Sequence, residues 1–270
     1  MPDEWYGGAS EARRRPEDSQ VRMSAGAVKS GLMPEMPRVL AVQNDTNGGP
    51  GRFGEWLNAA GVAVDVVTAF DGSALPVRLE HDGLIVLGGG YLPDDDDKAP
   101  WLPTTRALVE QALARSVPFF GICLGGQMLA SVGGGKVQGD AGAPEHGSTS
   151  ITMRAEAADD VVFGGLPVAV PAIENHIDAI TALPPGAVWL AETERCPYQA
   201  FRLGDRAWGV QFHPEAKPER IQQWDVEYIR RRGLDLDEVY AAAVTDDPLS
   251  RAAWGEVVSR FATLVKEGRP

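Results

Sequence analysis

The sequence predicts an α/β protein in which a doubly wound, mostly parallel sheet carries antiparallel additions and a helical C-terminal extension. Strands in the first half of the chain are continuously apolar, which is typical of parallel strands covered on both faces. Helical patterns separate these strands, as the crossovers of such a sheet require. After Gly135 the pattern changes to shorter β-like pieces, and from Pro218 onward it is helical again.

Each predicted element follows from a local pattern. Apolar runs predict buried strands at 39–42, 62–67, 84–87 and 117–122. Apolar side chains at helical spacing predict helices over 53–60 and 104–115. Strands alternating with helices in this way are typical of flavodoxin-like sheets. Later pieces predict strands that extend the sheet, at 150–153, 187–191, 198–203 and 207–212. Asp247 and Pro248 predict the cap and first turn of the last helix.

The same patterns divide the chain into three parts. Residues 1–36 are rich in Gly, Ser, Pro, Arg and Glu without a sustained apolar period, which predicts a disordered leader. Residues 37–217 carry the predicted α/β domain. Residues 218–270 form the helical extension, which we expect to pack on the same domain.

Composition and charge narrow the possible functions. The chain has 270 residues, 44% apolar and 23% charged, as in a soluble globular protein. It shows neither the apolar stretch of a membrane helix nor a secretion signal, so we expect a cytoplasmic protein without a membrane partner. A net charge of −13 without a basic stripe argues against a nucleic-acid partner. Neither Cys123 nor Cys196 has histidines at the spacing of a zinc site, so no metal is expected.

The segment around Cys123 carries the strongest chemical signal. Gly121 and Gly125 flank this cysteine where a predicted strand gives way to a predicted helix. Small residues at these positions allow the tight turn that lifts a nucleophile above the sheet. The helix N-terminus favours the thiolate, and the N–H of Leu124 is placed to hold an oxyanion. Cys123 is therefore the predicted nucleophile, whereas Cys196, beside a proline in a predicted loop, is expected to have no catalytic role.

A reactive thiol needs a base, and His213 is the best candidate among the four histidines. It follows a predicted apolar strand, and Glu215 stands two residues further on. A glutamate in this position can hold the imidazole in the tautomer that accepts the thiol proton. The sequence thus predicts a Cys123, His213 and Glu215 triad.

These motifs carry a resemblance to a known family. Gly121-Ile-Cys-Leu-Gly-Gly-Gln127 and Phe212-His-Pro-Glu215 resemble the nucleophile and His-Glu motifs of class I (triad) glutamine amidotransferases. Within that family the chain looks most like stand-alone members related to the amidotransferase domain of GMP synthetase. The resemblance implies hydrolysis of the glutamine side-chain amide through a cysteine thioester, without a cofactor.

The resemblance also assigns further residues. The glycine-rich turn after the third strand is implied to supply the second oxyanion N–H, from Gly89 or else Gly90. Gln127 is implied to contact the bound glutamine, and His176 and Asp178 to read its α-amino and α-carboxylate groups. An ordinary turn with a capping aspartate is the alternative for the last two.

The fate of the ammonia and the true substrate stay open. Family members usually pass ammonia to a synthase, and Gly133-Gly-Gly-Lys136 lacks the features of a phosphate-binding loop, so the resemblance implies a possible separate synthase chain. A γ-glutamyl amide or peptide hydrolase would use the same triad, and a non-catalytic regulatory, partner-binding protein would keep the fold. The run Asp94–Asp97 is either a lid over the substrate or a solvated helix start.

Overall fold

The structure, a computed structural model, describes residues 35–141 and 144–268. The chain divides into a unit of residues 1–35 and a unit of residues 36–270, and the fold below is that of the second unit. The leader predicted over residues 1–36 lies almost entirely outside the described residues and stays a prediction.

A nine-stranded mixed sheet forms the centre of this unit, in the order β2-β1-β3-β4-β11-β10-β9-β6-β7. Its parallel half consists of β1 (Arg38–Gln43), β2 (Ala63–Thr68), β3 (Gly83–Val86), β4 (Phe119–Ile122) and β11 (Ala207–Val210). Antiparallel pairing adds β10 (Ala200–Leu203), β9 (Val188–Glu192), β6 (Glu145–Met153) and β7 (Ala169–His176). A small second sheet pairs β5 (Lys136–Gln138) with β8 (Ala179–Ala182). The predicted fold class, a parallel sheet with antiparallel additions, is confirmed.

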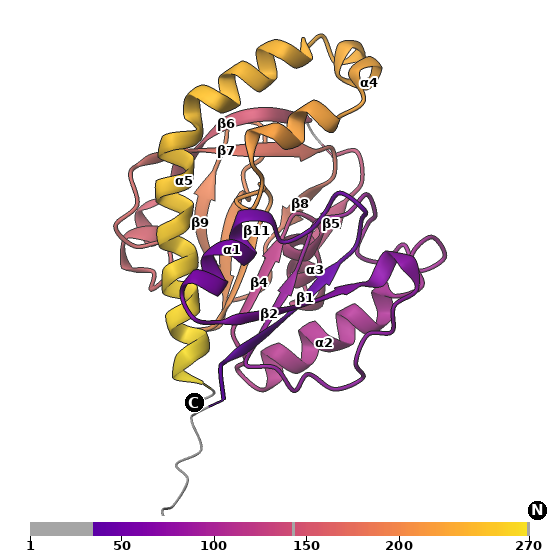
Figure 1. Cartoon of the computed structure of the whole chain (residues 1–270), viewed down its shortest axis with the longest axis vertical. Helices are drawn as coiled ribbons and strands as arrows, with labels where there is room; N and C mark the ends of the chain where they lie inside the picture. The colour runs from indigo at the N-terminus through magenta and orange to yellow at the C-terminus, as the bar shows by residue number, and fades with distance from the viewer. Residues whose placement is uncertain (1–34, 142–143, 269–270) are drawn as a thin grey trace, which may run out of the picture. The chain divides into compact units, whose positions relative to one another are not determined.

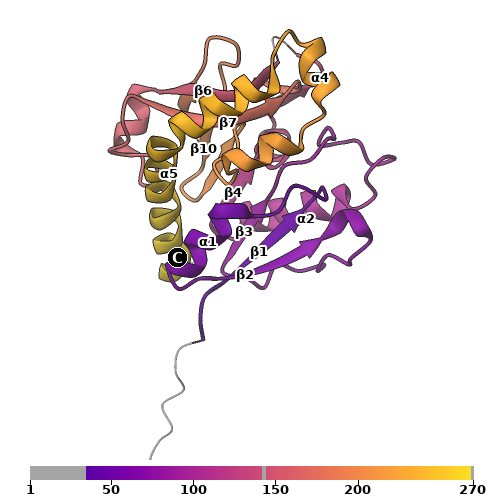
Figure 2. The same cartoon turned by 45° about the horizontal axis from the view of Figure 1, so that its top comes forward.

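Helices cover both faces of the parallel strands (Figure 1, Figure 2). The alternate side chains Val39 and Ala41 of β1 enter one buried cluster, and Leu40 and Val42 enter the other. The first cluster is closed by α1 (Gly51–Ala59) and α5 (Leu236–Glu267), the second by α2 (Leu102–Ala114) and α3 (Leu124–Val132). Burial on both faces explains why these strands are continuously apolar. The remaining helices are α4 (Val226–Arg231) and the short η1 (Ala69–Asp71), η2 (Ala155–Asp159) and η3 (Pro218–Gln223).

The last helix begins earlier than the sequence predicts. Helix α5 starts at Leu236, and the side chain of Asp235 caps it by accepting the N–H groups of Asp237 and Glu238. Pro248 lies inside the helix rather than in its first turn. Because proline has no N–H and crowds the preceding turn, we attribute to it the bend that α5 shows in Figure 1. The Asp-Pro pair signalled a helix start, but the chain continues through it as one bent helix.

Helix α5 is anchored by Trp254. This side chain is 1% exposed, its indole N–H donates to the carbonyl of Pro171 at 2.9 Å, and its ring lies 4.5 Å from that of Phe212. We expect Trp254→Ala to lower the free energy of unfolding by about 3–5 kcal/mol in a urea titration, through the cavity it leaves. The matched variant Leu249→Ala, on a side chain that is 48% exposed, should change it by less than about 1 kcal/mol. Equal effects of the two variants would contradict a structural role for α5.

Among the described helices, none combines the length and apolar character needed to cross a bilayer. The cytoplasmic location stays a prediction.

Candidate active site

Cys123 stands at a sharp turn between β4 and α3. Its backbone has φ 51° and ψ −108°, a region that a residue with a side chain enters only under strain. Neighbouring glycines make the turn possible, because a Cβ on Gly121 would lie 2.3 Å from the carbonyl oxygen of Gly125. A Cβ on Gly125 would lie 2.0 Å from the carbonyl oxygen of Val86. The predicted strand-turn-helix geometry around the cysteine is present.

His213 and Glu215 follow the end of β11 and are both buried. The backbone N–H of His213 donates to the carbonyl of Ile173 at 2.8 Å, which ties the segment to β7. The Nδ1 atom of His213 lies 2.8 Å from Oε1 of Glu215, and Arg220 contacts the same oxygen at 3.3 Å. The structure therefore pairs the predicted base with the predicted orienting carboxylate.

Electrostatics keep this pair charged. Burial disfavours the imidazolium, but the charge of Glu215 and hydrogen bonds to Cys123 and Glu215 outweigh it and raise the pKa of His213 to about 10. Burial also opposes ionisation of Glu215, yet the charges of His213 and Arg220 hold the pKa of that carboxyl below its usual value. At neutral pH the pair is therefore an imidazolium and a carboxylate.

Gln211 also contacts Cys123, although the sequence motifs do not assign it to the site. Its side-chain Nε2 donates to Sγ of Cys123 at 3.6 Å. The Oε1 atom of the same amide accepts from Nε2 of Gln127 at 3.1 Å, and Gln127 also donates to the carbonyl of Asp178 at 3.2 Å. This chain of bonds fixes which end of the Gln211 amide faces the sulfur. The signal in the sequence was a buried polar residue within an apolar strand end.

We expect Gln211→Met, which keeps the volume but removes the donor, to slow alkylation of Cys123 at neutral pH by roughly tenfold. The physical reason is that the sulfur loses a hydrogen bond that favours the thiolate. The measurement is the rate of iodoacetamide labelling at Cys123, followed by mass spectrometry. Gln111→Met is the control, because the amide oxygen of Gln111 accepts the backbone N–H of Leu79 and the side chain does not bond to the sulfur. Equal labelling rates in the two variants would contradict the role of Gln211.

Cys123 and His213 open into a cavity of about 250 Å³. The predicted oxyanion residues Gly89 and Gly90 line it, and so does Gly88, where a Cβ would lie 2.9 Å from Cε1 of His213. Leu124 is the first residue of α3, and an N–H in the first turn of a helix has no partner within it. The oxyanion roles of Gly89, Gly90 and Leu124 stay predictions that this arrangement supports.

The three predicted substrate-binding residues lie behind the cavity, outside its lining. Along β7, Ile173 and Asn175 line the cavity, so the alternate side chains Glu174 and His176 point to the other face of the strand. The ring of His176 lies 3.1 Å from the carbonyl of Asp178, to which Gln127 also donates. The Asp178 carboxylate accepts the backbone N–H of Asp140 at 2.9 Å. Direct contact of Gln127, His176 and Asp178 with substrate stays a prediction.

Other polar residues line the cavity, and the sequence motifs predicted a site role for none of them. The two charged side chains among them are Asp45, after β1, and Arg220, in η3. The remaining polar and aromatic lining residues are Asn47, Asn175, Gln223 and Trp224. Among these lining residues, Asn175 alone is adjacent in sequence to a residue that the resemblance had assigned to the substrate, namely His176.

The aspartate run at Asp94–Asp97 forms turns that precede α2, and none of its residues lines the cavity. Asp96 forms a two-pronged ion pair with Arg106 of α2, at 2.7 and 2.8 Å. Asp95 accepts from Lys98 and from the backbone N–H of Leu92. The Asp96–Arg106 pair fastens the segment to α2, and the Asp95 contacts hold it locally, so these contacts do not support a lid over the cavity.

Comparison with known proteins agrees with this geometry. Residues 55–231, more than half of the chain, match the family "Glutamine amidotransferase class-I". The chain is 42% identical over 142 residues to "GMP synthase [glutamine-hydrolyzing]" of Porphyromonas gingivalis, which covers 52% of this chain and 26% of that protein. It is 34% identical over 142 residues to one subunit of the glutamine-hydrolyzing GMP synthase of Methanopyrus kandleri, covering 52% of this chain and 70% of that protein. The chain thus spans about a quarter of the length of the first relative.

Solved structures share the fold. A glutamine amidotransferase from Thermotoga maritima superposes with a TM-score of 0.75 at 24% identity, covering 84% of this chain and 98% of that one. A glutamine amidotransferase from Methylobacillus flagellatus superposes with a TM-score of 0.73 at 26% identity, covering 87% and 96%. The family match spans the turn at Cys123 and the His213–Glu215 pair, and the structure places Cys123 and His213 in the lining of one cavity. The chain belongs to the class I glutamine amidotransferase family.

Proposed function

We propose that the chain hydrolyses the side-chain amide of glutamine through a thioester on Cys123. The observation that carries the proposal is that Cys123, at a strained turn, lines one cavity with His213, whose ring is bonded to the buried Glu215. The Cys123 thiolate attacks the amide carbon, and the N–H groups of Leu124 and of Gly89 or Gly90 stabilise the oxyanion. The C–N bond then breaks, and the imidazolium of His213 gives its proton to the departing ammonia.

The second half of the reaction uses the same residues. A water molecule loses a proton to the now neutral His213 and attacks the thioester carbon. The C–S bond breaks, glutamate leaves, and the thiolate–imidazolium pair is restored. Throughout the cycle Glu215 holds the ring orientation and stabilises its charged form.

The charges around the cavity support an α-amino acid as the substrate. Asp45 presents a carboxylate and Arg220 a guanidinium to the same 250 Å³ space. These opposite charges suit the α-ammonium and α-carboxylate groups of glutamine. Gln127, His176 and Asp178 would then act from behind, by holding β7 and the sulfur-facing amide of Gln211 in place.

We further propose that a separate synthase chain receives the ammonia. Support comes from relatives in Methanopyrus kandleri and Halobacterium salinarum that are named as single subunits of GMP synthase, which this chain matches over 70% and 76% of their length. A protein named as one subunit of an enzyme implies a further subunit that completes it. The part of this chain that the structure describes forms one fold of the amidotransferase kind, built around the nine-stranded sheet.

The test is a steady-state assay of glutamate release by the full chain, alone and with a candidate synthase, alongside labelling with a glutamine-mimicking chloroketone. We expect glutamine turnover and a label at Cys123. Absence of both, with the partner present, would overturn the proposal and favour a regulatory protein. Assayed in parallel, γ-glutamyl peptides with the higher kcat/KM would identify a γ-glutamyl hydrolase instead.

A further inference from the structure

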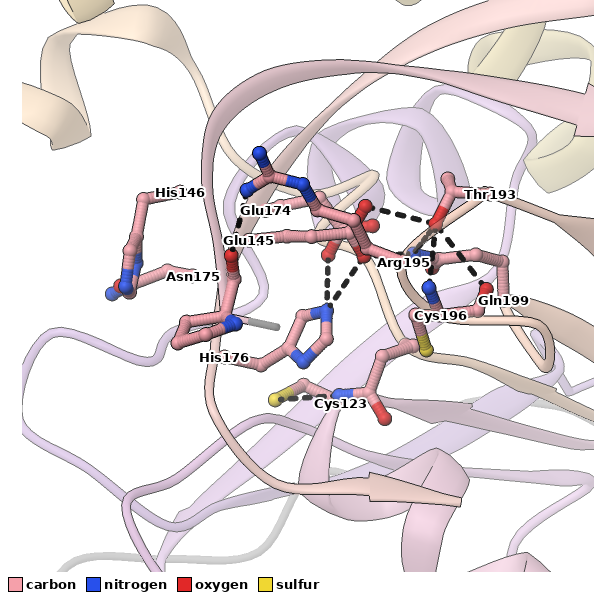
Figure 3. Close-up of polar contacts among 12 residues, drawn as sticks. Cys123, Glu145, His146, Glu174, Asn175, His176, Thr193, Arg195, Cys196 and Gln199 are labelled. Carbon is pink, nitrogen blue, oxygen red and sulfur yellow. Dashed lines mark hydrogen bonds and ion pairs between the residues drawn. The ribbon is translucent and has the colours of Figure 1, made fainter. Parts of the chain in front are cut away.

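A second cluster of reactive side chains lies outside the lining of the catalytic cavity, and Figure 3 shows its members and their polar contacts. It consists of Glu145 at the start of β6, Glu174 and His176 on the inner face of β7, and Cys196 before β10. All four are buried. The Nε2 atom of His176 lies 3.2 Å from a carboxylate oxygen of Glu145 and 3.5 Å from one of Glu174. One ligand atom each of Glu145, His176 and Cys196 lies within 4.8 Å of the other two.

The outer atoms of the cluster are held by further bonds. The ring nitrogen of His176 that faces away from the carboxylates lies 3.1 Å from the carbonyl of Asp178. Glu145 accepts from the hydroxyl of Thr193 and from the amide of Gln199, both at 2.8 Å. A histidine bonded to a carbonyl and a carboxylate bonded to neutral donors are the supports that metal ligands have in proteins.

Glu174 supplies the independent observation. Its side chain is fully buried, and within the described residues neither of its oxygens accepts a hydrogen bond. Its contact in the cluster is with the ring of His176, whose Nε2 atom lies 3.5 Å from one Glu174 oxygen and also contacts Glu145. Two buried carboxyl groups thus approach one imidazole nitrogen, and buried carboxyl oxygens left without a hydrogen bond are unfavourable. A divalent cation among these atoms would satisfy both carboxylates at once.

We propose that Glu145, Glu174, His176 and Cys196 bind a transition-metal ion, and that zinc is the ion they suit. The thiolate of Cys196, the imidazole nitrogen of His176 and a carboxylate oxygen of Glu145 are three ligands of the kind that zinc accepts. Glu174, with an oxygen 3.5 Å from the same imidazole nitrogen, is the fourth ligand of the proposal. All four ligands come from the protein, so the site is structural. Binding releases the thiol proton of Cys196 and any proton on Glu174. The ion would join β6, β7 and the 193–199 segment behind the cavity.

The ligands escape a search of sequence spacing because they are widely separated along the chain. The two on β7 are two residues apart, which places them on the same face of the strand. Strand pairing brings Glu145 opposite His176, and Cys196 arrives through the turn before β10. His176 thereby gains a role that the resemblance did not assign to it.

The sharpest test uses the full chain with Cys123→Ser, because the chain has two cysteines and Cys196 is then the only thiol left. After treatment with a chelator, this protein is titrated with Co²⁺ alone. We expect a thiolate-to-cobalt charge-transfer band that saturates at one equivalent and disappears when Zn²⁺ is added. A protein with native circular dichroism and no such band overturns the proposal, and this variant leaves every proposed ligand intact.

Matched variants then assign the ligands. Metal content after gel filtration, measured by mass spectrometry, should be one zinc per wild-type chain, with at least tenfold weaker binding in Cys196→Ser and Glu174→Gln. Glu194→Gln, an exposed carboxylate two residues from Cys196, is the control and should bind zinc as the wild type does. Equal zinc content in all of these chains would contradict the site. None of these measurements depends on glutamine hydrolysis, so the outcome is separate from that of the proposed function.

Discussion

Cys123→Ser is expected to lower kcat/KM for glutamine hydrolysis by roughly 10⁴-fold or more. Serine keeps the shape of the side chain, but its hydroxyl is a much weaker nucleophile than a thiolate. In the proposed mechanism the helix N-terminus and the His213 imidazolium stabilise that thiolate. The measurement is steady-state release of glutamate by the purified full chain. Cys123→Ala, assayed alongside, separates weak attack by the serine hydroxyl from catalysis by the rest of the site.

The fold should survive both substitutions, because neither serine nor alanine places a larger side chain on the strained backbone at position 123. Thermal unfolding within a few degrees of wild type would establish that. A glutamine-mimicking chloroketone should label the wild type and leave both variants unlabelled. Activity within tenfold of wild type in Cys123→Ala would mean that another group attacks the amide, and the proposed mechanism would then be wrong.

Glu215→Gln is expected to lower kcat by about 10³–10⁴-fold. The carboxylate that Gln replaces lies 2.8 Å from Nδ1 of His213 and holds the pKa of that ring up to about 10. An amide keeps the shape but not the charge, so the imidazolium loses its proton at lower pH. In the variant the fall of activity on the alkaline side should therefore move to lower pH. Glu219→Gln, an exposed neighbour, is the control and should leave the pH profile unchanged.

The same pair makes stability depend on pH with a definite sign. Because the folded pKa of His213 is raised, its contribution is fully present below about pH 6.5, the usual value for histidine, and is lost as the pH rises toward 10. Because the pKa of Glu215 is lowered, its contribution is lost as the pH falls through that lowered value. The difference in free energy of unfolding between wild type and Glu215→Gln should thus shrink from pH 6 toward pH 10. A difference that grows over this range would contradict the ion pair.

Features that depend on neighbouring residues were predictable. The glycines around Cys123 predicted a tight turn that residues with side chains at those positions could not make, and the structure has that turn. The two-residue step from His213 to Glu215 placed base and carboxylate within hydrogen-bond distance. The start of α5 was not predictable in this way, because Asp247 and Pro248 carry the local signal of a helix start while burial of the helix against the sheet decides its course.

Which side chains share a space depended on pairings between distant strands. A shift of one residue along β7 separates Asn175, which lines the cavity, from His176, which the resemblance had favoured. The sequence cannot show which face of β7 lines the cavity, because this strand has polar residues on both faces. Its pairing with β6 decides which face turns toward the cavity.

By itself the sequence determined the α/β class, the tight turn at Cys123, the closeness of His213 to Glu215 and the family, since each rests on backbone constraints or contacts over a few residues. Only the tertiary structure decided that Gln211 donates to the sulfur, that Asp45 and Arg220 enter the cavity, and that Cys196 joins a buried cluster with Glu174. The physical reason is that strand order and register bring these atoms together across dozens of residues, and no local pattern encodes that distance.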